Sequence, residues 1–189
     1  MSVLDSLMRH VAADGLEAHH LRQMIAFASA HDDPFDRSIS DGHFTGSAVV
    51  VSSEGDRVLL VFHRKLQCWL QPGGHADPRE TSGEEVALRE AREETGIEAL
   101  ALHAEAPRPL DVDIHRIPAY GDTPAHDHLD LRYLVVAAPG SEASPCAVET
   151  HGARWIRWDD IDEIRPDLPM RRMLEKARQW VRASPGAVL

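Results

Sequence analysis

A glycine-rich loop runs into a strongly patterned helix in the stretch Gly73-Gly-His-Ala-Asp-Pro-Arg-Glu-Thr-Ser-Gly-Glu-Glu-Val-Ala-Leu-Arg-Glu-Ala-Arg-Glu-Glu-Thr-Gly-Ile97. Ser82 followed three residues later by Glu85 is typical of a capping box at the start of a helix. Gly96 is well placed to end that helix, because glycine adopts the left-handed conformation that a helix C-terminus favours. The pattern therefore predicts a helix over residues 82–95.

Three glutamates of this helix share one face. Glu90, Glu93 and Glu94 stand at i, i+3 and i+4, where like charges repel by a few tenths of a kcal/mol (about 0.2–0.5) per pair. They also crowd the end of the helix at which the dipole disfavours anions. A divalent cation offsets both costs, and carboxylate oxygens suit Mg²⁺, Mn²⁺ or Ca²⁺. We expect Arg89 to orient Glu90 and to pair with Glu85. The alternative is an ordinary solvated acidic face.

The same stretch resembles the signature of the Nudix hydrolase family, G-x5-E-x7-R-E-U-x-E-E-x-G-U with U aliphatic. The interval from Gly74 to Glu80 keeps the x5 spacing, and Arg89 to Ile97 matches the second half, with the small Ala91 in place of U. The interval between the two halves is x8, one residue longer than in the family. That insertion falls around residues 81–83, where the loop enters the helix.

The resemblance implies an α/β (α+β) fold, a Nudix-type α/β/α sandwich with a mixed β-sheet. It implies hydrolysis of a nucleoside diphosphate linked to another group, with Mg²⁺ (or Mn²⁺) as cofactor. The metal ligands that it implies are the Gly73 carbonyl, Glu90, Glu93 and Glu94, with Glu80 more distant. The catalytic residues that it implies are Glu90, Glu93, Glu94, Arg89 and Glu149, which precedes a late Trp strand. Cations neutralise the diphosphate and activate a water molecule. One of Glu90, Glu93, Glu94 or Glu149 accepts the proton of that water. For Glu149, an ordinary loop acid is the alternative.

Elsewhere the pattern predicts an N-terminal helical extension over residues 1–40 and a Nudix hydrolase domain over 41–189. Residues 3–30 favour two short helices, and 31–42 have the composition of a linker. The predicted strands are 43–51, 57–63, 69 onward into a Gly-Gly loop, 111–117, 128–134 and 154–158, with hairpins joining the first pair and the 111–134 pair. A helix over 170–181 closes the chain. The extension is expected to pack over the sheet, form a dimer contact or cover the substrate cleft.

The second predicted hairpin is unusually polar. By alternation, Asp111, Asp113 and His115 share one face of their strand, and His126, His128, Asp130 and Arg132 share one face of the next. If the two faces merge, they form a wall rich in histidine and aspartate. One interpretation is a solvated sheet face. The other is a polar network near the active site, linked to a metal or to substrate selection.

Candidate substrate-binding residues are Arg64, Lys65, His75, His115, His126 and His128. Arg64 and Lys65 closely precede the Gly-Gly loop, which favours phosphate contact, although a solvated strand end is the alternative. His75 follows the glycine pair directly and is expected to contact either substrate or its own loop. Trp69 is interpreted as fold support or as a stacking surface for a base.

Composition and net charge limit the classes of molecule that the protein is expected to bind. The chain has 189 residues, a formal net charge of −11, twelve histidines and two cysteines. An acidic chain argues against binding nucleic acid or anionic membranes. The longest apolar runs are far shorter than a membrane-spanning helix, and no apolar export signal begins the chain. We expect a cytoplasmic protein that acts on a small-molecule diphosphate derived from a nucleotide, and we expect it to form a homodimer.

Two other functions compete with hydrolysis. Isopentenyl diphosphate isomerases of one type place a Gly-His near a Trp, as Gly74-His75 and Trp69 do here, but they lack the complete R-E-x-x-E-E-x-G pattern. Non-catalytic nucleotide-sensing Nudix domains usually carry a degraded signature and a DNA-binding segment. Other phosphate-binding and metal signatures are absent from the sequence. ADP-ribose, nucleotide sugars, dinucleoside polyphosphates, oxidised nucleotides and non-nucleotide diphosphates all stay open as substrates.

Overall fold

The computed structural model describes residues 2–64, 66–121, 123–143 and 150–184. Its elements are α1 (Val3–Arg9), α2 (Gly15–Ala30), β1 (Gly42–Val51), β2 (Arg57–His63), β3 (Cys68–Leu70), β4 (Gly73–His75), α3 (Gly83–Thr95), β5 (Leu100–Leu102), β6 (Asp111–Ile117), β7 (His126–Ala137), β8 (Thr150–Arg157), the 3-10 helix η1 (Trp158–Ile164) and α4 (Leu168–Ala183). Over these residues, no helix has the length and apolar character needed to cross a membrane.

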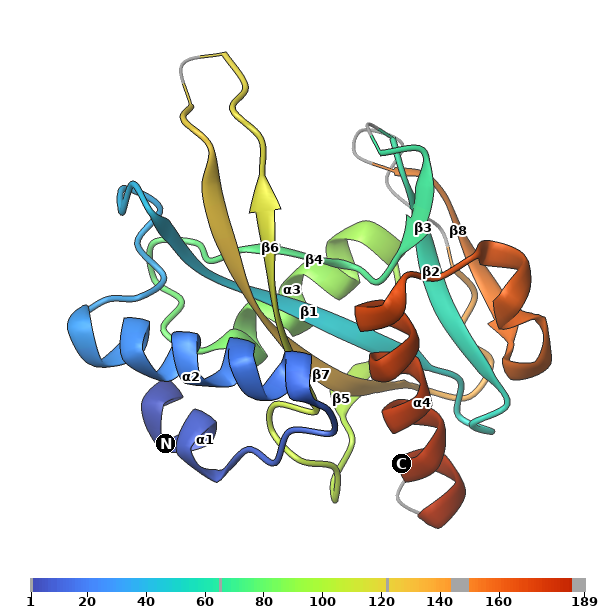
Figure 1. Cartoon of the computed structure of the whole chain (residues 1–189). Coiled ribbons are helices and arrows are strands. Elements are labelled where there is room, and N and C mark those ends of the chain that lie inside the picture. The colour runs from blue at the N-terminus through green and yellow to red at the C-terminus, as the bar shows by residue number, and fades with distance from the viewer. Residues whose placement is uncertain (1, 65, 122, 144–149, 185–189) are drawn as a thin grey trace.

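Within the described ranges, eight strands form one mixed sheet (Figure 1). The central strand β1 runs parallel to β7 and antiparallel to β2 and β4. β6 and β7 form the long hairpin that the sequence predicts, and β8 pairs with β2. The predicted mixed sheet and both predicted hairpins are confirmed.

Helices α3 and α4 lie on opposite sides of this sheet (Figure 1). Side chains alternate along β1, so Phe44, Ala48 and Val50 join one buried cluster that also contains Ala87 and Ala91 of α3. Val49 and Val51 point the other way, into a cluster with Met173, Leu174 and Ala177 of α4. The two clusters make the α/β/α sandwich that the resemblance implied.

Helix α2 satisfies backbone groups of β6. The amide of Val112 donates to the carboxylate of Glu17 at 3.3 Å, and the amide of Ile114 donates to Nδ1 of His20 at 3.1 Å. Among the described strands, β6 pairs only with β7, so its other edge is open to these side chains. Leu7 and Met24 are fully buried in the main core. Of the three roles considered for the N-terminal helices, packing against the sheet is therefore confirmed.

Two local predictions were wrong. The glycine pair, expected in a loop, lies in β4, where Gly73 and Gly74 pair with Ser47 and Gly46 of β1. The reason is that β2 pairs with β1 only at Val50 and Val51, which leaves the first half of the long strand open to another partner. Trp158, expected to end the last strand, instead begins η1.

Candidate active site

Helix α3 presents the predicted carboxylates beside β4. Ser82 accepts a hydrogen bond from the amide of Glu85, and Gly96 ends the helix with φ of +69°, a conformation that costs glycine little. Glu85 accepts from the amide of Thr81 at 3.3 Å. The predicted helix boundaries are therefore confirmed to within one residue.

The close approach of α3 to the sheet requires glycine at position 74. A Cβ atom there would lie 2.5 Å from Oε1 of Glu90 and 2.7 Å from its Cδ. The carboxylate of Glu90 therefore sits directly against the backbone of β4. At the neighbouring strand residue, the amide of Gly73 donates to Oε2 of Glu94 at 3.1 Å.

Arg89 holds the acidic groups around this strand in place. Its Nη1 donates to Glu90 at 3.0 Å and to Glu93 at 3.1 Å, and its Nε and Nη2 each donate to Glu80 at 3.0 Å. Nη2 also donates to the backbone carbonyl of His75 at 2.7 Å. The helix pair expected between Arg89 and Glu85 was wrong, because the guanidinium group turns to Glu80, Glu90 and Glu93 instead.

These contacts keep both partners charged. Burial by itself would raise the pKa of Glu80, but hydrogen bonds from Arg89 and from the Asp77 amide outweigh it and lower the pKa. Burial would likewise lower the pKa of Arg89, but its bonds with Glu80 and Glu90 raise it. The interval between Glu80 and Arg89 is one residue longer than in the family signature, and the two side chains still pair.

The donor set suits a hard divalent cation. Glu90, Glu93 and Glu94 offer carboxylate oxygens on one helical face beside the backbone of β4, and oxygen ligands are those that Mg²⁺ and Mn²⁺ prefer. In the described part of the chain, these three carboxylates do not come within 4.8 Å of one another as a group. Arg89 and the Gly73 amide occupy them, and Mg²⁺ keeps several of its own waters, so this spacing fits a hydrated ion.

The polar wall forms as predicted, but most of it is buried. Asp111 pairs with Arg132 across the hairpin, and Asp113 pairs with Asp130. Arg132 is only 4% exposed and contacts Asp113 and Asp130 at 2.9 Å and Asp111 at 3.2 Å. Arg172 of α4 adds a 2.8 Å bond to Asp111. The interpretation as a solvated face was wrong for these residues, because α2 and α4 cover them.

At the other end of the wall, four histidines meet from three strands. They are His43 of β1, His75 of β4, and His126 and His128 of β7. Burial is the largest cause that lowers the pKa of His43 and His75 to about 4 and that of His128 to about 3. Repulsion between neighbouring imidazoles, which would arise if they were protonated together, lowers these pKa values further. These three imidazoles are therefore neutral at neutral pH.

A family model described as NUDIX domain matches residues 42–179. The chain belongs to the NUDIX family. A putative 8-oxo-dGTP diphosphatase of Bacillus subtilis (strain 168) is 34% identical over 111 residues, which cover 59% of this chain. The match spans 64% of that relative's length.

Solved structures share the NUDIX fold. A NUDIX-family hydrolase from Clostridium perfringens superposes with a TM-score of 0.58 at 25% identity, covering 73% of this chain and 97% of the other. An Ap4A hydrolase of C. elegans, in a binary complex, superposes with a TM-score of 0.59 at 21% identity, covering 74% and 98%. The latter likeness concerns the fold alone. The predicted family and fold class of this NUDIX protein are confirmed.

Other predicted site residues lie in parts of the chain other than α3 and β4, or outside the described residues. Arg64 is exposed in the turn that follows β2. Lys65 and Glu149 lie outside the described residues. His115 is 44% exposed, and its ring lies 5.3 Å from that of His128, so it borders the histidine group.

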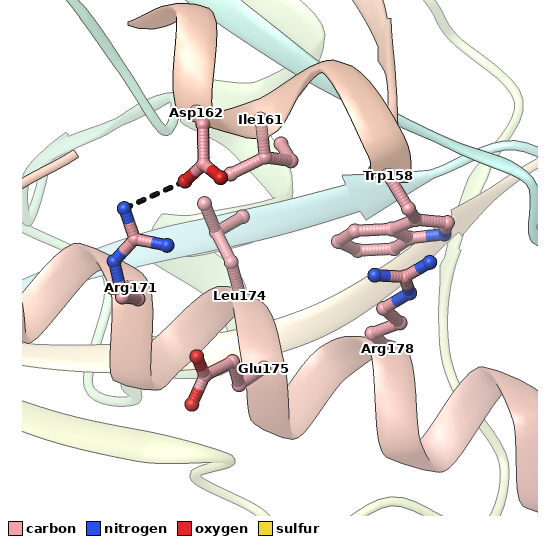
Figure 2. Close-up of a pocket in the computed structure, with 7 residues that line it drawn as sticks. All are labelled: Trp158, Ile161, Asp162, Arg171, Leu174, Glu175 and Arg178. Atoms are coloured by element: carbon pink, nitrogen blue, oxygen red, sulfur yellow. Dashed lines mark ion pairs between the residues drawn. The ribbon is translucent and has the colours of Figure 1, made fainter. Parts of the chain in front are cut away.

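A surface pocket of this NUDIX protein lies elsewhere, between η1 and α4 (Figure 2). Arg171 pairs with Asp162 across it at 2.8 Å, and Arg178 lies beside Trp158 in the view. Its lining contains none of the predicted site residues. We place the candidate active site by the chemistry at α3 and β4, because this pocket offers no comparable group of carboxylates.

Sequence reasoning missed His43. The signal was present, because His43, Thr45 and Ser47 alternate with apolar residues and therefore mark a polar face on β1. In the structure, Thr45 and Ser47 donate to Asp130 at 3.1 and 2.7 Å.

Proposed function

We propose that this NUDIX protein is a Mg²⁺- or Mn²⁺-dependent pyrophosphohydrolase that cleaves a nucleoside diphosphate linked to another group. The observation that carries the proposal is Arg89, which gathers Glu80, Glu90, Glu93 and the backbone of β4 into one arrangement. An isolated acidic face needs no such anchor. A site that must hold carboxylates in fixed positions does.

Each residue has a proposed part. Glu90, Glu93, Glu94 and the Gly73 carbonyl would hold the cation, and Arg89 would fix the orientation of Glu90 and Glu93. The cation, when bound, neutralises diphosphate oxygens and activates water for in-line attack. One of Glu90, Glu93, Glu94 or Glu149 would accept the proton of that water.

Oxidised nucleoside triphosphates are the first substrate class to test. The Bacillus subtilis relative, a putative 8-oxo-dGTP diphosphatase, supports that class over the part of the chain that it matches. Arg64, Lys65 and His115 are proposed to contact the substrate. The homodimer and the cytoplasmic location stay predictions.

The test is a Mg²⁺/Mn²⁺-dependent hydrolysis screen of 8-oxo-dGTP, dinucleoside polyphosphates, ADP-ribose and nucleotide sugars, with the nucleotide products separated by chromatography. Glu93→Gln and Glu94→Gln should each lower turnover by about 100-fold or more, because each removes a charge that holds the cation or accepts a proton. Glu98→Gln is the matched control, since Glu98 is an exposed residue just beyond the helix.

The outcomes separate the candidate functions. Hydrolysis that both helix variants lose, and that Glu98→Gln keeps, supports the proposal. Nucleotide binding without turnover on any compound points instead to a sensor. Double-bond migration in isopentenyl diphosphate would favour the isomerase.

A further inference from the structure

His43, His75, His126 and His128 lie on one side of β4, and the carboxylate of Glu90 lies on the other. Neighbouring side chains of a strand point to opposite faces, so Gly74 faces Glu90 while the imidazole of His75 projects to the other side. The register of the sheet pairs His43 with His128 and Thr45 with His75. Three strands therefore deliver imidazoles to one point.

His43 has no hydrogen-bond partner in this position. It is 3% exposed, and both of its ring nitrogens are buried without a partner. An unsatisfied buried polar group costs about 1–3 kcal/mol, so such a group requires an explanation. Its ring lies 5.0 Å from that of His75 and 5.1 Å from those of His126 and His128, measured between centroids.

The other three rings direct nitrogen atoms at one another. Nδ1 of His126 lies 2.9 Å from the carbonyl of Pro124. A carbonyl only accepts, so we assign the hydrogen to Nδ1, which leaves a lone pair on Nε2 in the neutral ring. That Nε2 lies 3.3 Å from Nε2 of His128, which in turn lies 3.0 Å from Nε2 of His75.

These contacts cannot all be hydrogen bonds between neutral rings. Nε2 of His128 carries at most one hydrogen and can donate it to His75 or to His126, but not to both. At least one of the two contacts is then left without a hydrogen bond. A cation at the centre turns every one of these nitrogens into a ligand and gives His43 a partner.

We propose that His43, His75, His126 and His128 bind one Zn²⁺ ion in a closed, structural site. All four ligand atoms lie within 4.8 Å of one another. Two nitrogens on a tetrahedral zinc, at Zn–N bonds of about 2.0–2.1 Å, lie about 3.3 Å apart, close to the two separations observed. The bond from His126 to a backbone carbonyl is the support that a ligating imidazole usually has.

The histidine site and the carboxylate site select different ions. Four imidazole nitrogens suit zinc, whereas Mg²⁺ prefers oxygen. With four protein ligands, no coordination position stays open for substrate, so the ion is structural. It ties β1, β4 and β7 together directly behind the strand on which Glu90 and Glu94 rest.

The experiment uses the full chain, purified without a histidine tag, stripped with a chelator and dialysed against Zn²⁺ alone. We expect one equivalent of zinc to remain after desalting, and Co²⁺ substitution to give the intense visible bands of a tetrahedral ion. His43→Ala and His126→Gln should each weaken zinc binding by more than about 10-fold. Circular dichroism checks that the variants fold.

Two controls locate the ion. His115→Ala should keep its zinc, because His115 touches the group from outside the four ligands. Glu93→Gln together with Glu94→Gln should keep it too, which separates this site from the carboxylates. The proposal is overturned if the wild type retains no zinc, if Co²⁺ gives only weak octahedral bands, or if the folded His43→Ala protein binds zinc as tightly as the wild type.

Discussion

His75 connects the two candidate centres through Arg89. Its backbone carbonyl accepts a hydrogen bond from Arg89 Nη2 at 2.7 Å, and its imidazole Nε2 faces that of His128 at 3.0 Å. Arg89 in turn holds Glu90 and Glu93. A displacement of β4 would therefore move both the carboxylates held by Arg89 and the imidazole of His75.

Arg89→Lys should lower kcat/KM by about 10–100-fold, as expected when a residue that orients metal ligands is lost. A lysine keeps the charge but cannot reproduce the fork of donors that reaches four groups at once. Steady-state kinetics at saturating Mg²⁺ would measure the effect. Arg79→Lys, at an exposed position nearby, is the control. Equal losses in both variants would contradict an orienting role.

Gly74→Ala should weaken Mg²⁺ binding by about 10–100-fold while the protein stays folded. The new methyl carbon would lie 2.5 Å from Oε1 of Glu90, so the carboxylate must move. Isothermal titration with Mg²⁺ measures the loss. Gly15→Ala, where nothing lies within 4 Å of the added carbon, should bind Mg²⁺ normally. Unchanged affinity in Gly74→Ala would argue against Glu90 as a ligand.

Arg132→Leu should lower the free energy of unfolding by about 3–5 kcal/mol, because it removes the guanidinium group that contacts three buried aspartates. Arg116→Ala removes an exposed pair with Asp127 on the same hairpin and should cost less than about 1 kcal/mol. Urea denaturation of both variants gives the comparison. Similar costs would mean that the wall is more hydrated than its burial indicates.

Glu17→Gln should alter how stability depends on pH. Burial would raise the pKa of Glu17, but hydrogen bonds from His10, the Ala13 amide and Lys176 lower it below its ordinary value of 4.5. A carboxyl with a depressed folded pKa stabilises the protein above its unfolded pKa and loses that contribution as the pH falls through and below it.

The wild type should therefore lose stability below about pH 4.5 more steeply than Glu17→Gln. At pH 7 the variant should be less stable by about 3–5 kcal/mol, because Lys176 and His10 lose their partner. Thermal unfolding between pH 3 and pH 7 measures both effects. Parallel pH profiles would show that Glu17 is not the titrating group.

Much of the fold followed from local pattern. The capping residue Ser82 and Gly96 bound α3, and turn residues separate β1 from β2. These signals act between residues a few positions apart, so they are visible in the sequence. The pairing of the Gly73–Gly74 segment was not visible in the sequence, because its partner is the distant strand β1.

The spacing of Glu80, Arg89, Glu90, Glu93 and Glu94 is enough to identify the family, and residue alternation is enough to identify the polar strand faces. The burial of Arg132 and the meeting of His43 with three other histidines become visible only in the folded chain. Burial and such convergence depend on how distant segments pack, here α2 and α4 over β6 and β7, and β4 against β1. The periodicity of one segment does not predict which distant segment packs against it.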